Sequence, residues 1–114
     1  MRWVQFLGNV VRDADLKFGL GSKAQGLVLR AVDVLFDVEQ GGIRGLRERL
    51  ERAGLAGDLE NWLDPQQEIR LPETDWVDQV IGSAEVSRIG KELGLANARV
   101  RSVFAFVLPS LIRS

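Results

Sequence analysis

The stretch Val38-Glu39-Gln40-Gly41-Gly42-Ile43 decides how this chain folds, because one helical pattern stops there and another begins. Two adjacent glycines weaken a helix and permit the tight turn that a break between helices requires. After the break, Ile43, Leu46 and Leu50 recur at the three- and four-residue spacing of an amphipathic helix. The stretch therefore predicts a helix end followed by a new helix over about 43–53, with these three apolar residues turned inward.

Outward from that break, apolar residues keep helical spacing along most of the chain, and no segment shows the alternation typical of a strand. The pattern predicts helices over about 2–12, 23–38, 43–53, 56–63, 74–81, 84–93 and 97–113, with residues 13–21 as a connector. The second and the last of these helices are apolar on more than one face, which is typical of central helices. Pro109 predicts either a kink in the last helix or its end near Leu108.

The length of the chain, 114 residues, is that of one domain. The sequence predicts a single all-α domain over 1–114, an irregular bundle of about six to seven helices. Residues 1–21 would form an N-terminal helix and connector, and residues 22–114 the core. Glycines at the expected helix ends and one large apolar anchor support this organisation: Gly41, Gly42, Gly54, Gly82, Gly94 and Trp62.

The composition narrows the chemistry that is available to the chain. It has no Cys, so it has no thiolate nucleophile and no thiolate metal site, and it has no His, the commonest general base and metal ligand. Its acidic residues in the segment 56–82 are interpreted as a solvated face rather than as paired catalytic carboxylates. We therefore predict no enzyme activity, no cofactor and no metal.

Charge is balanced overall but unevenly distributed. The net charge is −1, with −6 over residues 56–82 and +3 over residues 83–114. We expect the acidic middle and the basic end to attract each other or to face water. Nucleic acid and membranes are not expected partners, since the net charge is slightly negative and the longest apolar stretch, 103–108, is far too short to span a bilayer. With no evident secretory signal, the expected location is the cytoplasm.

From Val38 to its C-terminus, the chain resembles the YidB-like proteins. The matching elements are Gln40-Gly41-Gly42-Ile43, Leu46, Leu50, Ala53-Gly54-Leu55, Trp62, Val80-Ile81-Gly82, Leu93-Gly94-Leu95 and Leu108-Pro109. The resemblance implies a small all-helical bacterial protein of a family without an established activity. Each matching residue also has a structural reason to be where it is, so the resemblance names a fold and no catalytic site.

The main functional interpretation is a protein–protein interaction or adaptor module. The first predicted helix places Trp3, Phe6 and Val10 on one face, and Phe106 lies opposite the main apolar stripe of the last helix. These residues would contact an unidentified protein partner or a second copy of the chain. The alternative that the first helix packs on its own core stays open.

The second interpretation is a DNA-binding helix-turn-helix over residues 86–103. Gly90 would let two helices approach, and Gly94 would make the turn between them. The major groove would then face the polar residues Asn97, Arg99, Arg101 and Ser102. Against this interpretation, the same helix continues into the apolar run 103–108, which must be largely buried.

Overall fold

The computed structural model describes residues 2–35, 37, 39, 41–71 and 73–113, with side chains throughout these ranges except at residues 2–4 and 35. Within this part of the chain the regular structure is entirely helical. The helices are α1 (Arg2–Phe18), α2 (Lys23–Leu35), α3 (Gly42–Arg52), α4 (Ala56–Leu63), α5 (Trp76–Ile81), α6 (Ser83–Leu93) and α7 (Asn97–Arg113). The predicted all-α class and the number of helices are thereby confirmed.

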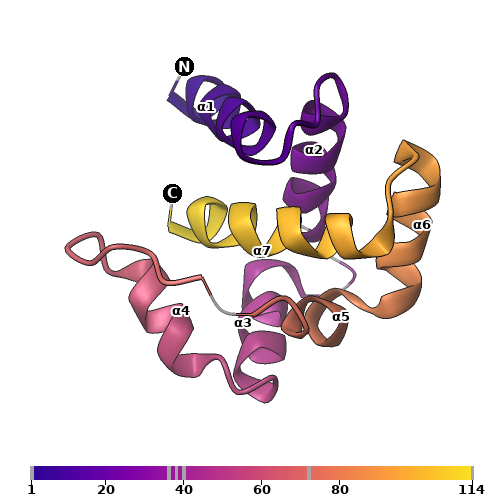
Figure 1. Cartoon of the computed structure of the whole chain (residues 1–114). Helices are drawn as coiled ribbons and strands as arrows, with labels where there is room; N and C mark the ends of the chain where they lie inside the picture. Colours follow the sequence, from indigo (N-terminus) through magenta and orange to yellow (C-terminus); the bar gives the residue numbers. More distant parts are fainter. Residues whose placement is uncertain (1, 36, 38, 40, 72, 114) are drawn as a thin grey trace.

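Helix α7 lies at the centre of the molecule, as Figure 1 shows. It packs against α1, α2, α4, α5 and α6, and its most extensive contact is with α2. Val103, Phe104 and Val107 in its middle are completely buried. The prediction that the second and last helices are central is confirmed, because burial of a wide apolar surface requires neighbours on several sides.

The break between α2 and α3 has the backbone that the glycine pair predicts. Gly41 precedes α3 with φ 88° and Gly42 begins it with φ 62°, both in the left-handed region that glycine tolerates best. Leu46 and Leu50 are buried as expected, whereas Ile43 is 57% exposed. The inward placement of Ile43 was wrong because it lies in the first turn of α3, before the helix reaches the core.

The remaining signature residues also lie where the sequence places them. Gly54 follows the end of α3 with φ 81°, Gly82 separates α5 from α6, and Gly94 ends α6 with φ 68°. After Gly94, the Leu95 amide donates back to the Gly90 carbonyl at 2.8 Å, which satisfies an orphan carbonyl of the last turn. The ends of α3, α5 and α6 could thus be predicted from the glycines that follow them.

The predicted end of the first helix was wrong. Helix α1 continues through the expected connector to Phe18, and Ala14 within that segment is completely buried. Val10, Ala14 and Phe18 continue one helical stripe at four-residue spacing against the core. The helix predicted over 23–38 ends at Leu35 in the structure. Residues 36 and 38 of that prediction, and residue 40 of the predicted break, lie outside the described residues.

Helix α7 continues past Pro109 to Arg113 rather than ending near Leu108. Pro109 removes one backbone donor, yet Leu108 and Leu111 on either side of it are buried. The guanidinium of Arg113 donates to the carbonyls of Trp62 and Asn61 at 2.7 and 2.8 Å, at the C-terminus of α4. Packing and this cap hold the last turn of α7 in place despite the proline.

The loop after α4 is organised by two buried side chains of that helix. The Asn61 amide donates to the Glu68 carbonyl at 3.0 Å and accepts from the Arg70 amide at 2.9 Å. The Trp62 indole N–H donates to the Arg70 carbonyl at 2.9 Å. Trp62 is completely buried and its ring lies 5.8 Å from that of Trp76, which confirms its predicted role as an anchor.

Candidate functional site

A charged cleft lies where α2, α3, α5 and α6 meet. It has a volume of about 340 Å³ and is lined by Arg30, Asp33, Val34, Asp37, Arg49, Ile81, Glu85 and Arg88. This volume is at the lower end of the range of small-molecule sites, about 300–1,000 Å³. Six of the eight lining residues are charged, three of each sign, so the cleft suits a polar ligand that carries both signs of charge.

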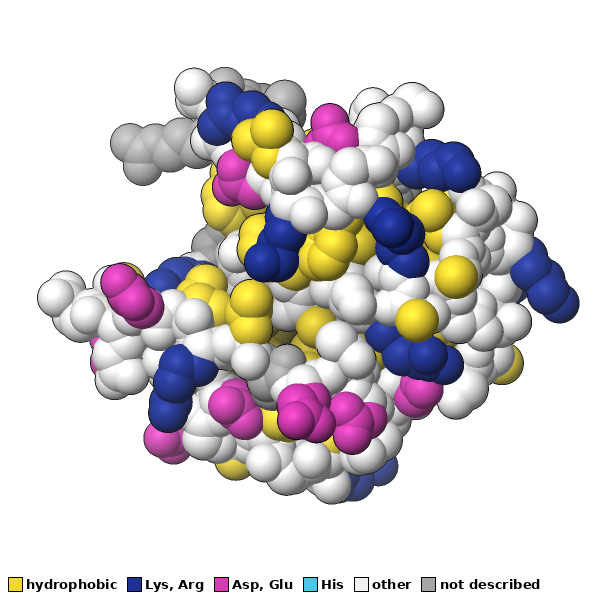
Figure 2. All heavy atoms as spheres, viewed as in Figure 1, with side chains coloured by type: hydrophobic (Ala, Val, Ile, Leu, Met, Phe, Trp, Pro, Cys, Tyr) yellow, Lys and Arg dark blue, Asp and Glu magenta, His cyan; other side chains and the backbone are white. Residues whose placement is uncertain are grey.

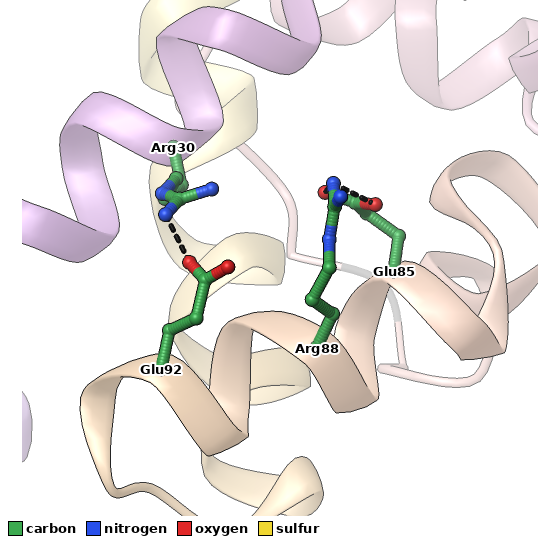
Figure 3. A network of polar contacts seen from close by, with 4 residues as sticks. All are labelled: Arg30, Glu85, Arg88 and Glu92. Carbon is green, nitrogen blue, oxygen red and sulfur yellow. Dashed lines mark hydrogen bonds and ion pairs between the residues drawn. The ribbon is translucent and has the colours of Figure 1, made fainter.

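Two ion pairs hold four of the charges around the cleft, as Figure 3 shows. Arg30 of α2 pairs with Glu92 of α6 and so joins the two helices. Arg88 pairs with Glu85 within α6, and the hydrogen bond that its guanidinium donates to the Glu85 carboxylate raises the pKa of Arg88. These four side chains already have partners, and their mutual attraction is screened by water because all four are at least about one third exposed.

Arg49 of α3 is the most deeply placed cation of the cleft. Its Nη1 donates to the Val80 carbonyl at 2.7 Å and its Nε to the Gly45 carbonyl at 3.3 Å. Its Nη2 is buried and has no hydrogen-bond partner among the described residues. Burial lowers the pKa of Arg49, and Asp37 opposes that shift. The fold therefore leaves an incompletely satisfied guanidinium here.

Two carboxylates of the cleft are not committed to an ion pair. Within the described residues, no cation lies in salt-bridge contact with Asp33 or Asp37. Among the described residues, the Asp37 carboxylate accepts one hydrogen bond, from the Glu39 amide at 3.1 Å. In the described ranges, no three acidic side chains are placed to hold a metal ion. Among the described residues, the cleft thus contains two carboxylates without an ion pair and one guanidinium with a single unpartnered nitrogen, Nη2 of Arg49.

The sequence interpretation did not predict this cleft, although charged residues in α2 and just after it follow a helical spacing. Arg30, Asp33 and Asp37 recur at three- and four-residue spacing and form a charged stripe beside the apolar one. Such a stripe is normally a solvated helix face. Only the positions of α3 and α6 turn it into the wall of a cleft.

The predicted partner-binding residues are divided between core and surface. Val10 is buried in the chain's own core, and Phe6 packs partly buried against that core. The side chain of Trp3 lies outside the described residues. Phe106 is half-buried beneath the end of α1, with the Phe18 ring edge-on at 5.7 Å and the Lys17 ammonium 5.3 Å from its ring centre. These positions favour a packing role for Val10 and Phe106.

An apolar surface that the sequence did not predict lies at the end of α4. Figure 2 shows hydrophobic side chains in the hollow between α1 above and α4 with its following loop below. Leu63 and Leu71 are 43% and 47% exposed. Both adjoin the hydrogen bond between Trp62 and Arg70, so they lie at the same end of the molecule. We name these two residues, with the half-buried Ile69 between them in sequence, the α4-loop patch.

The predicted DNA-contacting residues take four different environments. Asn97 is exposed at the start of α7, and Arg99 donates to the Phe18 carbonyl at 2.6 Å. Arg101 forms an ion pair with Asp78 at 3.0 Å, and Ser102 donates to the Ala98 carbonyl at 3.0 Å. The Arg101–Asp78 pair joins the basic end of the chain to its acidic middle, as the charge distribution predicts.

Helices α6 and α7 meet at 105°, within the range of about 90–120° found in helix-turn-helix motifs. No single helix in the described ranges is long and apolar enough to span a membrane. Among the described residues, α6 and α7 reach that length and hydropathy only when they are taken together, and they are bent at the break between them.

Comparison with known proteins identifies relatives of the chain. The sequence model of a family described as YidB-like protein matches residues 6–114. A relative, "Uncharacterized protein YidB" of Escherichia coli (strain K12), is 35% identical over 74 residues, which are 65% of this chain and 56% of the relative. The chain thus matches little more than half the length of that protein. No solved structure matches.

Proposed function

Since the chain belongs to the YidB-like family, whose matched relative is uncharacterised, we propose from its surface that it is a non-enzymatic protein-binding module. The observation that carries this proposal is the apolar hollow between α1 and α4 with its following loop, shown in Figure 2. Leu63 at the end of α4 and Leu71 in the loop after it are also 43% and 47% exposed, although the described residues bury a core elsewhere. Exposed apolar surface on a small protein is typical of a surface that a partner covers.

The rigidity of the α4-loop patch supports the proposal. Its backbone is fixed by the bonds of Asn61 and Trp62 to residues 68 and 70, so the patch is presented without further ordering. A preorganised surface binds more tightly than a mobile one, because less conformational entropy is lost on association.

The proposal is tested by capture of partners from a bacterial lysate with the tagged chain, followed by quantitative mass spectrometry. The double variant Leu63→Ser, Leu71→Ser should lose the proteins that the wild type retains. The matched control is Leu29→Ser on α2, which is also 47% exposed but lies away from the α4-loop patch. Equal recovery of every protein by all three chains would refute the proposal. Light scattering of the same variants tests the case in which the partner is a second copy.

A DNA-binding helix-turn-helix is the second candidate, and the 105° angle between α6 and α7 favours it. The first turn of α7 is its most exposed part, because Arg101 is held by Asp78 and Val103 and Phe104 beyond it are buried. A mobility-shift assay with mixed DNA at low and high salt tests this candidate. Salt-sensitive binding that is lost on Arg99→Ala would favour it over the protein-binding module.

A further inference from the structure

We propose that the partner of the α4-loop patch is an amphipathic helix with basic residues along one side of its apolar stripe. The inference rests on the proposed protein-binding function and adds the chemistry of the partner. It starts from the charges around the patch, because burial of apolar surface gives affinity but does not select one apolar partner over another. In protein interfaces the charges around the apolar centre make that selection.

The charges around the α4-loop patch are nearly all negative. Residues 56–75, from α4 to the start of α5, contain six acidic residues against one basic residue, Arg70, a net charge of −5. Among the described residues, none of the six is in an ion pair. Four of them are exposed: Glu60, Glu68, Glu73 and Asp75. Apolar surface in such surroundings favours a partner that combines apolar and basic side chains.

Two cations on the neighbouring helices already have partners within the chain. The Arg113 guanidinium donates to two backbone carbonyls at the end of α4. The Lys17 ammonium of α1 lies 5.3 Å from the ring centre of Phe106. Figure 2 shows basic side chains along the α1 edge of the hollow and a row of acidic side chains below it, over α5 and the segment before it. The basic side of the partner helix would therefore face the α4 loop and α5, and its other side α1.

A helix is the form of partner that this surface suits. The described residues contain no strand, so this part of the chain offers an extended peptide no sheet edge. An amphipathic helix instead places its apolar stripe on a hydrophobic surface and keeps its charged residues at the sides. A helix of about 18 residues is about 27 Å long, which is close to the extents of the molecule, 32 × 32 × 26 Å. A segment of that length is sufficient to cross this face.

Three peptides of about 18 residues test the inference by fluorescence anisotropy with the full chain. All three have the same leucine stripe with glutamine on one side, and the other side is lysine, glutamine or glutamate. We expect the lysine peptide to bind at least tenfold more tightly than the glutamate peptide at about 0.02 M salt. At about 1 M salt, where the Debye length is about 3 Å, the ratio should fall below about threefold. The variant Leu63→Ser, Leu71→Ser should weaken all three peptides.

Charge variants locate the basic side of the bound helix. Glu68→Gln, Glu73→Gln should weaken the lysine peptide at least about fivefold and strengthen the glutamate peptide, because these exposed carboxylates lie close in sequence to Leu71. The matched control is Asp33→Asn, Glu48→Gln, which removes two exposed carboxylates from α2 and α3. It should bind the lysine peptide as the wild type does.

Equal binding of the three peptides that is lost in Leu63→Ser, Leu71→Ser would overturn the inference and leave the protein-binding function standing. Full lysine preference in Glu68→Gln, Glu73→Gln, or an equal loss in the control, would overturn it as well, because the charge would then act elsewhere or without a fixed position. Failure of all three peptides to bind would also overturn it. Capture of lysate proteins through Leu63 and Leu71 then decides separately whether the protein-binding function stands.

Discussion

Replacement of Asn61 by alanine should destabilise the protein more than any exposed substitution in the same region. Asn61 is 3% exposed and is the one buried polar residue in the described part of the chain. Its side chain makes three hydrogen bonds to the following loop, to Gln67 at 3.1 Å, to the Glu68 carbonyl at 3.0 Å and from the Arg70 amide at 2.9 Å. The variant removes all of them and leaves two backbone groups without partners.

The magnitude follows from these bonds. The two bonds to backbone contribute about 1 kcal/mol each, and the unsatisfied groups that they leave add to the loss. The bond to the exposed Gln67 contributes less, because water replaces it. We expect the free energy of unfolding to fall by about 2–4 kcal/mol, and the melting temperature by roughly 8–17 °C in a chain of this size.

Urea denaturation followed by tryptophan fluorescence measures the loss, since Trp62 is adjacent and its ring contacts Trp76. The matched control is Gln67→Ala, which removes the exposed partner of Asn61 and an exposed hydrogen bond to Asp64, and should lower the free energy of unfolding by less than about 1 kcal/mol. A loss in Asn61→Ala that is no larger than in the control would refute the assignment of the loop's stability to Asn61.

The isosteric variant Asn61→Asp adds a pH test. A carboxylate can accept from the Arg70 amide but faces the Glu68 carbonyl oxygen without a proton to donate. The folded state therefore raises the pKa of this Asp above its unfolded value of about 3.9. The stability of the variant relative to wild type should be highest below that pH and fall as pH rises through the folded-state pKa.

Three further predictions concern the helix junctions and one ion pair. Gly54→Ala should destabilise by about 1 kcal/mol through its positive φ, whereas Gly57→Ala within α4 should be neutral or stabilising, as thermal denaturation can show. Gly90→Ala should lower the free energy of unfolding by more than about 2 kcal/mol, because its Cβ would lie 2.7 Å from a backbone oxygen of the α6–α7 turn. A double-mutant cycle on Arg101→Ala and Asp78→Ala should give a coupling energy of about 1 kcal/mol, and additivity would contradict a formed pair.

Much of the candidate protein-binding surface was beyond prediction from sequence. Residues Phe6 and Val10 have the spacing of a docking face, but α1 packs on α7 and α2, which buries Val10. An amphipathic helix has the same pattern whether its apolar face meets the chain's own core or a partner. Leu63 and Leu71 belong to a short helix and a loop without periodicity. Their exposure depends on where Asn61 and Trp62 hold the loop.

The sequence by itself determined the helical class, the helix ends that glycines mark and most of the core. Those features depend on local physics, namely the backbone freedom of Gly54 and Gly94 and the periodic spacing of apolar residues in α7. Only the tertiary structure decided that α7 runs through Pro109, that Ile43 stays exposed and that Arg101 is held by Asp78. It also decided that charges of α2, α3 and α6 enclose one cleft. Each of these outcomes depends on contacts between residues far apart in the chain, and local spacing carries no information about such contacts.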